Sequence, residues 1–272
     1  MPKRITKDPK LFSDEPFLEK AFEKEQPKRR VAFFDIDGTI FRSSLLIELI
    51  NELVARNIFP KKAGNEIIGK HIAWLDRVGR YDEYLYQVVL VHLKYIKGCR
   101  AEDVKRIVEV IIKEQGDRVY RYTRDLIKRL KSDGYYMVVI SGSPIYMVKE
   151  FADRMGFDEA FGQILDTKRG VFTGEIVNKN FRDKESIIKE FCASVKFGVD
   201  LAASLAVGDT DNDIPMLNMV GKPIAFNPNR ILAEYAKKAG WDIIVERKDS
   251  IYKINDFELA PYQGMDEKGL EF

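Results

Sequence analysis

The pattern of apolar positions changes twice along the chain. Residues 31–34 form an uninterrupted apolar run, which is typical of a strand buried on both faces of a parallel sheet. Between residues 43 and 116 the apolar positions recur at helical spacing, which predicts about four helices and no strand. From residue 117 onward, helical patterns alternate with short apolar runs. The pattern therefore predicts an α/β fold with a parallel sheet, interrupted by an all-helical block.

The second half of the chain supplies the other elements of the predicted sheet. Residues 161–177 are interpreted as a strand, a turn at 168–170 and a return strand. Short apolar runs predict further strands at 136–140, in the second half of 201–207, at 223–226 and at 241–245. Helices are predicted at 117–131, 145–155, 184–191, 216–220 and 231–239.

These elements predict a division of the chain into four parts. The helical block directly follows the first strand and is long enough to bury its own core as a small bundle, so we interpret it as an inserted domain. The parts are a polar N-terminal extension (1–28), a core domain (29–42 and 117–248), a helical cap domain (43–116) and a C-terminal tail (249–272).

Composition narrows the function classes. The chain of 272 residues carries 45 basic and 43 acidic residues, a balance that argues against broad nucleic-acid binding but permits a local anion pocket. Two cysteines, Cys99 and Cys192, make neither a disulfide framework nor a zinc site. No apolar stretch reaches the ~18 residues of a membrane span, and residues 1–30 contain no apolar signal core. We therefore expect a cytoplasmic monomer or homodimer with no membrane or nucleic-acid partner.

Polar residues that could take part in catalysis or ligand binding follow the predicted strands or begin the predicted helices. Because parallel strands end at one edge of a sheet, residues far apart in sequence can meet there. Gly38 allows the chain to leave the first strand sharply. The candidate residues are Asp35 and Asp37 after the first strand, Ser141 and Gly142 after the second, Lys184 at a helix start, and Asp209, Asn212 and Asp213 after the third.

These residue types suit phosphoryl chemistry. The carboxylates of Asp35 and Asp209 are hard oxygen ligands that suit Mg²⁺, and a carboxylate beside the cation can attack phosphorus to form an aspartyl-phosphate. Ser141 and the amides near Gly142 can bind phosphate oxygens at a helix N-terminus. Lys184 adds positive charge where the transition state spreads negative charge. Asp37 is placed to protonate the leaving group and then to deprotonate water.

In this order, the clusters resemble the four motifs of the haloacid dehalogenase (HAD) superfamily of phosphohydrolases. The matching residues are Asp35-Ile-Asp-Gly-Thr39, Ser141, Lys184 and Gly208-Asp-Thr-Asp-Asn-Asp213, and the resemblance covers most of residues 30–246. The helical insert resembles a type C1 cap on a Rossmann-like core. The sequence Ile-Pro-Met-Leu that follows Asp213 resembles subfamily IB, the phosphoserine-phosphatase-like group.

The resemblance implies a role for each motif residue. Asp35 would be the nucleophile and Asp37 the general acid and base, a pairing that favours a phosphatase over the carbon–halogen hydrolases and ATPases of the family. The implied Mg²⁺ ligands are Asp35, the carbonyl of Asp37 and Asp209, with Asp213 supporting the metal shell and the lysine. The residues implied to hold phosphate are Ser141, Gly142, Lys184 and Asn212.

The substrate is expected to be a small phosphorylated metabolite. Phosphoserine phosphatases carry a glutamate for the substrate amine nine residues after the nucleophile, and here that position is Ser44, so the sequence does not assign phosphoserine. Arg42, Ser43 and Ser44, at the start of the helical block, are candidates for specificity contacts. We also expect this block to close over the substrate.

Three alternatives remain open at this point. One is a phosphotransferase or mutase that passes the phosphoryl group to a sugar hydroxyl. Another is a phosphoacceptor signalling domain, which needs neither a helical cap nor a second aspartate. The third is a catalytically silent binding protein of the same fold.

Overall fold

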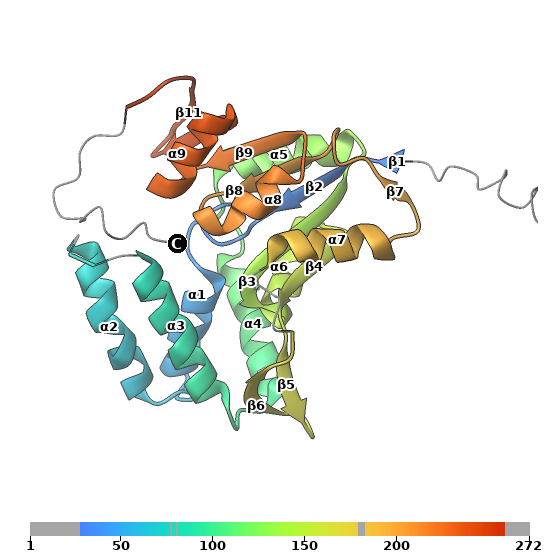
Figure 1. The fold of residues 1–272 in the computed structure, drawn as a ribbon. Coiled ribbons are helices and arrows are strands. Elements are labelled where there is room, and N and C mark those ends of the chain that lie inside the picture. The colour runs from blue at the N-terminus through green and yellow to red at the C-terminus, as the bar shows by residue number, and fades with distance from the viewer. Residues whose placement is uncertain (1–27, 77, 80, 179–182, 259–272) are drawn as a thin grey trace, which may run out of the picture.

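The computed structural model describes residues 28–76, 78–79, 81–178 and 183–258 (Figure 1). The expected N-terminal extension, except Lys28, and residues 259–272 of the expected tail lie outside the described residues.

A seven-stranded sheet forms the centre of the molecule. Its order is β11-β10-β9-β8-β2-β3-β4, and all neighbours are parallel except β10 and β11. The first strand of the sheet in sequence, β2, thus lies between β8 and β3, so its end is flanked by the ends of both. The strands are β2 (Val31–Phe34), β3 (Tyr136–Pro144), β4 (Glu159–Gln163), β8 (Leu205–Gly208), β9 (Lys222–Phe226), β10 (Asp242–Arg247) and β11 (Ser250–Ile254).

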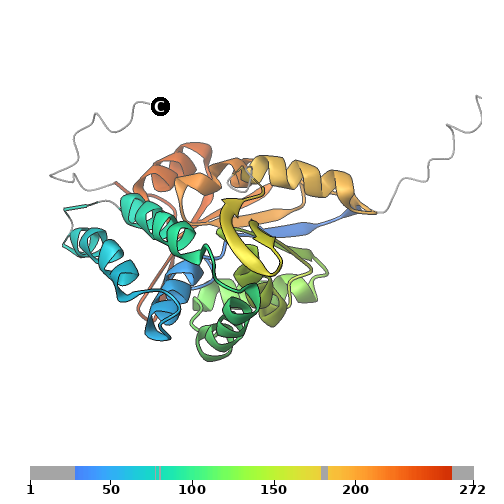
Figure 2. The ribbon, with the colours of Figure 1, turned by 90° about the horizontal axis from the view of Figure 1, so that it is seen from below.

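Alternate residues of β2 pack into two different apolar cores. Val31 and Phe33 face α7 (Lys184–Ser194), α8 (Ile214–Asn218) and α9 (Arg230–Ala239), whereas Ala32 and Phe34 face α5 (Arg121–Ser132) and α6 (Ile145–Met155). Figure 2 shows α7, in gold, on one side of the strands and α5 and α6, in green, on the other. Burial on both faces explains why this strand is uniformly apolar.

The helical block consists of α1 (Leu45–Ala55), α2 (Lys61–Leu75), α3 (Tyr81–Ile96) and α4 (Ala101–Gln115), which lie below the sheet in Figure 1. Two linker segments join it to the core and pair with each other. Arg42 N donates to Arg118 O at 2.9 Å, and Tyr120 N donates to Ile40 O at 2.9 Å. The apolar cluster of the block is continuous with that of α5 and α6, because α1 and α4 pack against α6. The block is therefore firmly docked on the core.

A hairpin of β5 (Leu165–Lys168) and β6 (Val171–Ile176) holds the far end of the block. Gly98 N donates to Phe172 O at 2.9 Å, and Phe172 N donates to Cys99 O at 3.0 Å. These bonds tie the turn between α3 and α4 to the core.

Four details differ from the sequence-based prediction. Residues 141–144, predicted to follow the strand at 136–140, belong to β3 itself, which ends at Pro144. The region 161–177 is not a simple hairpin, because residues 159–163 form β4 of the central sheet and only 165–176 form the hairpin. Residues 250–254, predicted as part of a polar tail, form the antiparallel edge strand β11. A short parallel pair, β1 (Lys28–Arg29) with β7 (Gly198–Val199), was not predicted. The side chains of β11 and β1 are mostly exposed, so these two strands lack an apolar pattern that could predict them.

The prediction of an α/β fold, with a Rossmann-like core and an inserted helical cap, is confirmed. None of the helices that the structure describes combines the length and the apolar character needed to cross a membrane.

Candidate active site

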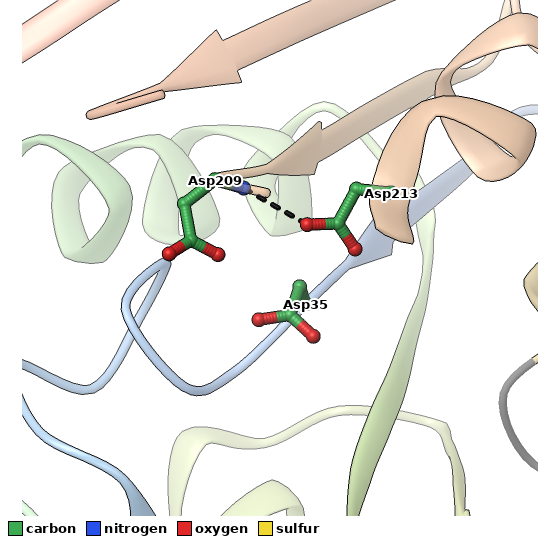
Figure 3. A group of neighbouring side chains, drawn as sticks. All are labelled: Asp35, Asp209 and Asp213. Carbon is green, nitrogen blue, oxygen red and sulfur yellow. Dashed lines mark hydrogen bonds between the residues drawn. The ribbon is translucent and has the colours of Figure 1, made fainter. Parts of the chain in front are cut away.

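The ends of β2 and β8 bring two acidic segments together. Asp35 N donates to Val207 O at 3.0 Å, so the chain is still paired with β8 where the first carboxylate begins. Asp35, Asp209 and Asp213 each offer a carboxylate oxygen, and these oxygens lie within 4.8 Å of one another. Figure 3 shows the three side chains converging from the two segments. The acidic residues that follow β2 and β8 thus lie at the same edge of the sheet, as the sequence predicted.

Two glycines leave the room that this convergence needs. Gly38 has a φ of +83°, and a Cβ added there would lie 2.1 Å from Asp209 Oδ2. Gly208 ends β8, and a Cβ there would lie 2.4 Å from Asp213 Cβ. A side chain at either position would push the acidic groups apart, since real atoms do not approach so closely.

Lys184, the first residue of α7, supplies positive charge to the cluster. Its Nζ donates to Asp35 Oδ1 at 2.6 Å and to Asp213 Oδ1 at 2.5 Å. Burial lowers the pKa of Lys184, but Asp213 and Asp35 outweigh burial and leave this pKa above its ordinary value. The lysine is therefore a permanent cation at the site.

Burial disfavours the ionised forms of the carboxylates. It raises the pKa of Asp35 to about 7, although the adjacent Lys184 acts in the opposite direction. Burial and the charge of Asp35 also raise the pKa of Asp209 well above its ordinary value. Three clustered carboxylates beside one lysine leave an excess of negative charge, which a divalent cation would compensate. The donor set, hard oxygens only, fits such a cation.

Asp213 has both carboxylate oxygens engaged. Besides the Lys184 bond to Oδ1, its Oδ2 accepts from Asp209 N and Thr210 N, each at 3.0 Å. Asp213 thereby fixes the loop that carries Asp209, whereas Asp35 and Asp209 are better placed to bind a cation.

Asp37 belongs to a separate set of contacts. Its Oδ1 accepts from Leu45 N at 2.6 Å, and its Oδ2 accepts from Ser143 Oγ at 2.6 Å and Ser141 Oγ at 3.2 Å. Burial raises the pKa of Asp37, and these three hydrogen bonds oppose the rise. The carboxylate of Asp37 thus joins the end of β3 to the first helix of the cap, and it does not belong to the three-carboxylate cluster of Asp35, Asp209 and Asp213.

The remaining predicted site residues differ in their exposure to solvent. Gly142 and Asn212 are exposed, Gly142 near the end of β3 and Asn212 on the turn Asp211–Asp213. The Arg42 side chain is exposed, with its guanidinium 5.6 Å from the centre of the Tyr120 ring. Ser44 is buried at the N-cap position of α1.

The sequence predicted no site role for two residues that hydrogen-bond the carboxylates, or for two tyrosines whose pKa values the carboxylates affect. Thr39 Oγ1 donates to Asp209 Oδ1 at 3.0 Å, and Ser143 contacts Asp37. Burial, and after it the charges of Asp37 and Asp209, raise the pKa of Tyr81, the first residue of α3. Burial, and after it the charge of Asp209, raise the pKa of Tyr120 on the second linker. Thr39 ends the motif Asp35–Thr39, so a sequence signal exists for it, whereas Ser143, two residues after Ser141, and the two tyrosines lie outside the motifs and carry no local signal.

Comparisons with known proteins agree with this geometry. The chain is 26% identical over 222 residues to "Phosphoserine phosphatase SerB1" of Mycobacterium tuberculosis, covering 78% of this chain and 69% of the relative. It is 28% identical over 225 residues to "Phosphoserine phosphatase" of Methanocaldococcus jannaschii, covering 82% and 95%. A solved structure described as "Phospho-Aspartyl Intermediate Analogue of Phosphoserine phosphatase" superposes with a TM-score of 0.55 at 25% identity, covering 82% and 95%.

The family comparison covers more than half of the chain. Residues 32–218 match the family of haloacid dehalogenase-like hydrolases, a range that contains both linkers, the cap and all the motif residues. The predictions of a phosphatase and of likeness to phosphoserine phosphatases are confirmed at this level. The chain belongs to the haloacid dehalogenase-like hydrolases.

Proposed function

We propose that this protein is a Mg²⁺-dependent phosphatase that hydrolyses a small phosphomonoester through an aspartyl-phosphate on Asp35. The observation that carries the proposal is the contact of Lys184 with Asp35 and Asp213 inside a three-carboxylate cluster, with Asp37 beside it. A nucleophilic carboxylate, a fixed cation and a second carboxylate with different partners are the groups that two-step phosphoryl transfer needs.

In the first step an Asp35 oxygen forms a bond to phosphorus while the bond to the leaving oxygen breaks. Asp37 gives its proton to that oxygen, so the product leaves as an alcohol. In the second step water attacks the aspartyl-phosphate, Asp37 takes a proton from the water, and inorganic phosphate is released with Asp35 restored. Lys184 stays charged throughout and stabilises the negative charge of both transition states.

Bound Mg²⁺ would supply charge that offsets the repulsion between Asp35 and the incoming phosphate. Asp35, Asp209 and the carbonyl of Asp37 would hold it, with Asp213 keeping the loop of Asp209 in place. Ser141, Gly142 and Asn212 would bind the phosphate oxygens; the exposure of Gly142 and Asn212 leaves both reachable for a ligand.

The relatives, together with Ser44 and Arg42 at the start of the cap, bear on the substrate class. Relatives named phosphoserine phosphatase make phosphoserine one candidate. Ser44 is 4% exposed at the N-cap of α1, the first helix of the cap, and it has no carboxylate that could bind the amine of phosphoserine. We therefore propose a small phosphorylated metabolite with Arg42 as a specificity contact. The cytoplasmic location and a monomeric or dimeric state stay predictions.

The test is a panel of small phosphomonoesters with the purified protein and Mg²⁺, with free phosphate as the product measured. The Asp35→Asn variant should retain its fold by circular dichroism and lose at least about 1000-fold in kcat, because it lacks the nucleophile. A normal rate in this variant, or no turnover by the wild type on any ester, contradicts the proposal. Appearance of a phosphorylated acceptor in place of free phosphate would indicate a phosphotransferase.

A further inference from the structure

We propose that Ser143 is a positioning residue that holds Asp37 ready to protonate the leaving group. This inference rests on the proposed function, because it assigns a support to the acid of that reaction. Ser143 is 3% exposed, and its Oγ lies 2.6 Å from Asp37 Oδ2, closer than the 3.2 Å of Ser141 Oγ to the same oxygen. A buried hydroxyl at this distance from a carboxylate makes a strong hydrogen bond with a fixed direction.

Ser141 and Ser143 differ as hydrogen-bond donors to Asp37. The Ser141 hydroxyl has a single proton, which it now donates to Asp37, while its oxygen accepts from Ser143 N at 3.0 Å. When Ser141 turns that proton toward a bound phosphate, Asp37 loses one of its two hydroxyl donors. Ser143 then remains as the hydroxyl that orients the Asp37 side chain.

The two carboxylate oxygens of Asp37 have different hydrogen-bond partners. Oδ2 of Asp37 accepts from the two hydroxyls, whereas Oδ1 accepts only from Leu45 N among the described residues. In this proposal the transferable proton is on Oδ1, the oxygen with fewer hydrogen-bond donors. As the bond between phosphorus and the leaving oxygen breaks, this proton moves to the leaving oxygen, and the hydrogen bond from Ser143 stabilises the carboxylate that remains.

The test uses the dependence of the rate on the leaving group. A poor leaving group needs the proton of Asp37, whereas a good one departs as an anion without help. The substrates are phenyl, 4-nitrophenyl and 2,4-dinitrophenyl phosphate, which share one ring and differ in the acidity of the phenol. The value to compare is kcat/KM, because it reports the step in which the ester bond breaks.

Ser143→Ala should lower kcat/KM for phenyl phosphate by about 10- to 100-fold and for 2,4-dinitrophenyl phosphate by less than about twofold. Ser143→Thr, which keeps the hydroxyl, should restore most of the loss. In an Asp37→Asn background, Ser143→Ala should change the phenyl phosphate rate by less than about twofold, because the acid that it positions is gone.

The matched control is Ser204→Ala. Ser204 is also a fully buried serine, but its Oγ bonds Val31 N and Asp200 O at the opposite end of β2. This variant should be less stable yet show the leaving-group dependence of the wild type. An equal loss on all three esters in Ser143→Ala, or an undiminished loss in the Asp37→Asn background, would overturn the inference. Absence of turnover in the wild type would instead count against the proposed function.

Discussion

At the scale of single residues, the site is an arrangement of buried charge. Asp35 and Asp213 share the ammonium group of Lys184, and Asp209 lies in the same cluster with Thr39 as its hydrogen-bond donor. Removing such charges from water is costly, and a single lysine does not balance three carboxylates. The cluster therefore binds either a proton or a cation, and these two compete.

This competition predicts a pH dependence of metal binding. Burial raises the pKa of Asp35 from 3.8 to about 7, so between these values the metal-free folded protein holds a proton that the unfolded chain has lost. This group therefore stabilises the metal-free fold at low pH, and the stabilisation is lost as pH rises through about 7. Mg²⁺ needs the carboxylate, so its affinity should rise over the same range.

Thermal unfolding with Mg²⁺ or with a chelator measures this effect. The Mg²⁺-induced increase in Tm should be small at about pH 5.5 and clearly larger at about pH 8, since the stabilisation that a ligand gives to the fold increases with its affinity. In Asp35→Asn, which has no proton to displace at this position, the difference between the two pH values should shrink. Equal increases at both pH values in the wild type would contradict the competition.

Gly38 allows a second prediction at this scale. Gly38→Ala should abolish measurable Mg²⁺ binding and phosphatase activity and lower the free energy of unfolding by about 1–3 kcal/mol, because the new Cβ would strike Asp209 and the φ is positive. Gly134→Ala is the control, since Gly134 has a φ of +77° but nothing within 4 Å of an added Cβ. It should lose stability through the same backbone strain and keep activity. Similar activity losses in both variants would show that backbone strain, and not the contact with Asp209, is responsible.

At the scale of elements, the cap is held at two places. Its linkers, residues 40–42 and 118–120, pair beside the site, and the β5–β6 hairpin binds the α3–α4 turn at the far end. Because α1 and α4 also pack on α6, movement of the whole cap as one body would break contacts at the hairpin and at α6. Closure over a substrate, if it follows the sequence-based hypothesis, should therefore involve the linkers and the site-facing end of α3.

Hydrogen exchange with and without Mg²⁺ and vanadate, a phosphate mimic, measures this closure. Exchange at residues 42–44, 118–120 and the first turn of α3 should slow when the mimic binds, because closure would suppress opening of the linker hydrogen bonds and bury the remaining amides. The amides of Gly98 and Phe172, which already form the hairpin contacts, should exchange at an unchanged rate. Identical protection of the linkers in both states would count against closure.

At the scale of the whole molecule, the cap and the core share one apolar interior. Phe41, on the first linker, packs edge-on against Phe151 of α6 with ring centres 5.8 Å apart, and both belong to the cluster that includes α1 and α4. Two regions joined by a continuous core are expected to unfold together.

Differential scanning calorimetry should therefore show one cooperative transition for the metal-free protein. Phe151→Ala should lower the free energy of unfolding by about 3–5 kcal/mol, because it empties a fully buried site, and should shift the single transition without splitting it. Two resolved transitions in the wild type would show that the cap unfolds separately.

Much of this molecule follows from local pattern. The apolar run 31–34 followed by Asp35 and Asp37 predicted a buried strand with acidic groups at its end, and helical spacing predicted the elements of the cap. Both signals are periodicities of a few residues that reflect burial of one element, so they are visible in the sequence. The edge strand β11 was missed because an exposed strand has no such periodicity.

The sequence alone determined the residue types at the sheet edge and the class of chemistry, since carboxylates, a serine and a lysine after successive strands already suit phosphoryl transfer. Only the tertiary structure decided which atoms meet: Lys184 with Asp35, 149 residues apart, Ser143 as well as Ser141 with Asp37, and Arg42 over Tyr120. The physical reason is that such contacts depend on strand order and on side-chain direction, which are set by packing of the whole chain and leave no local pattern.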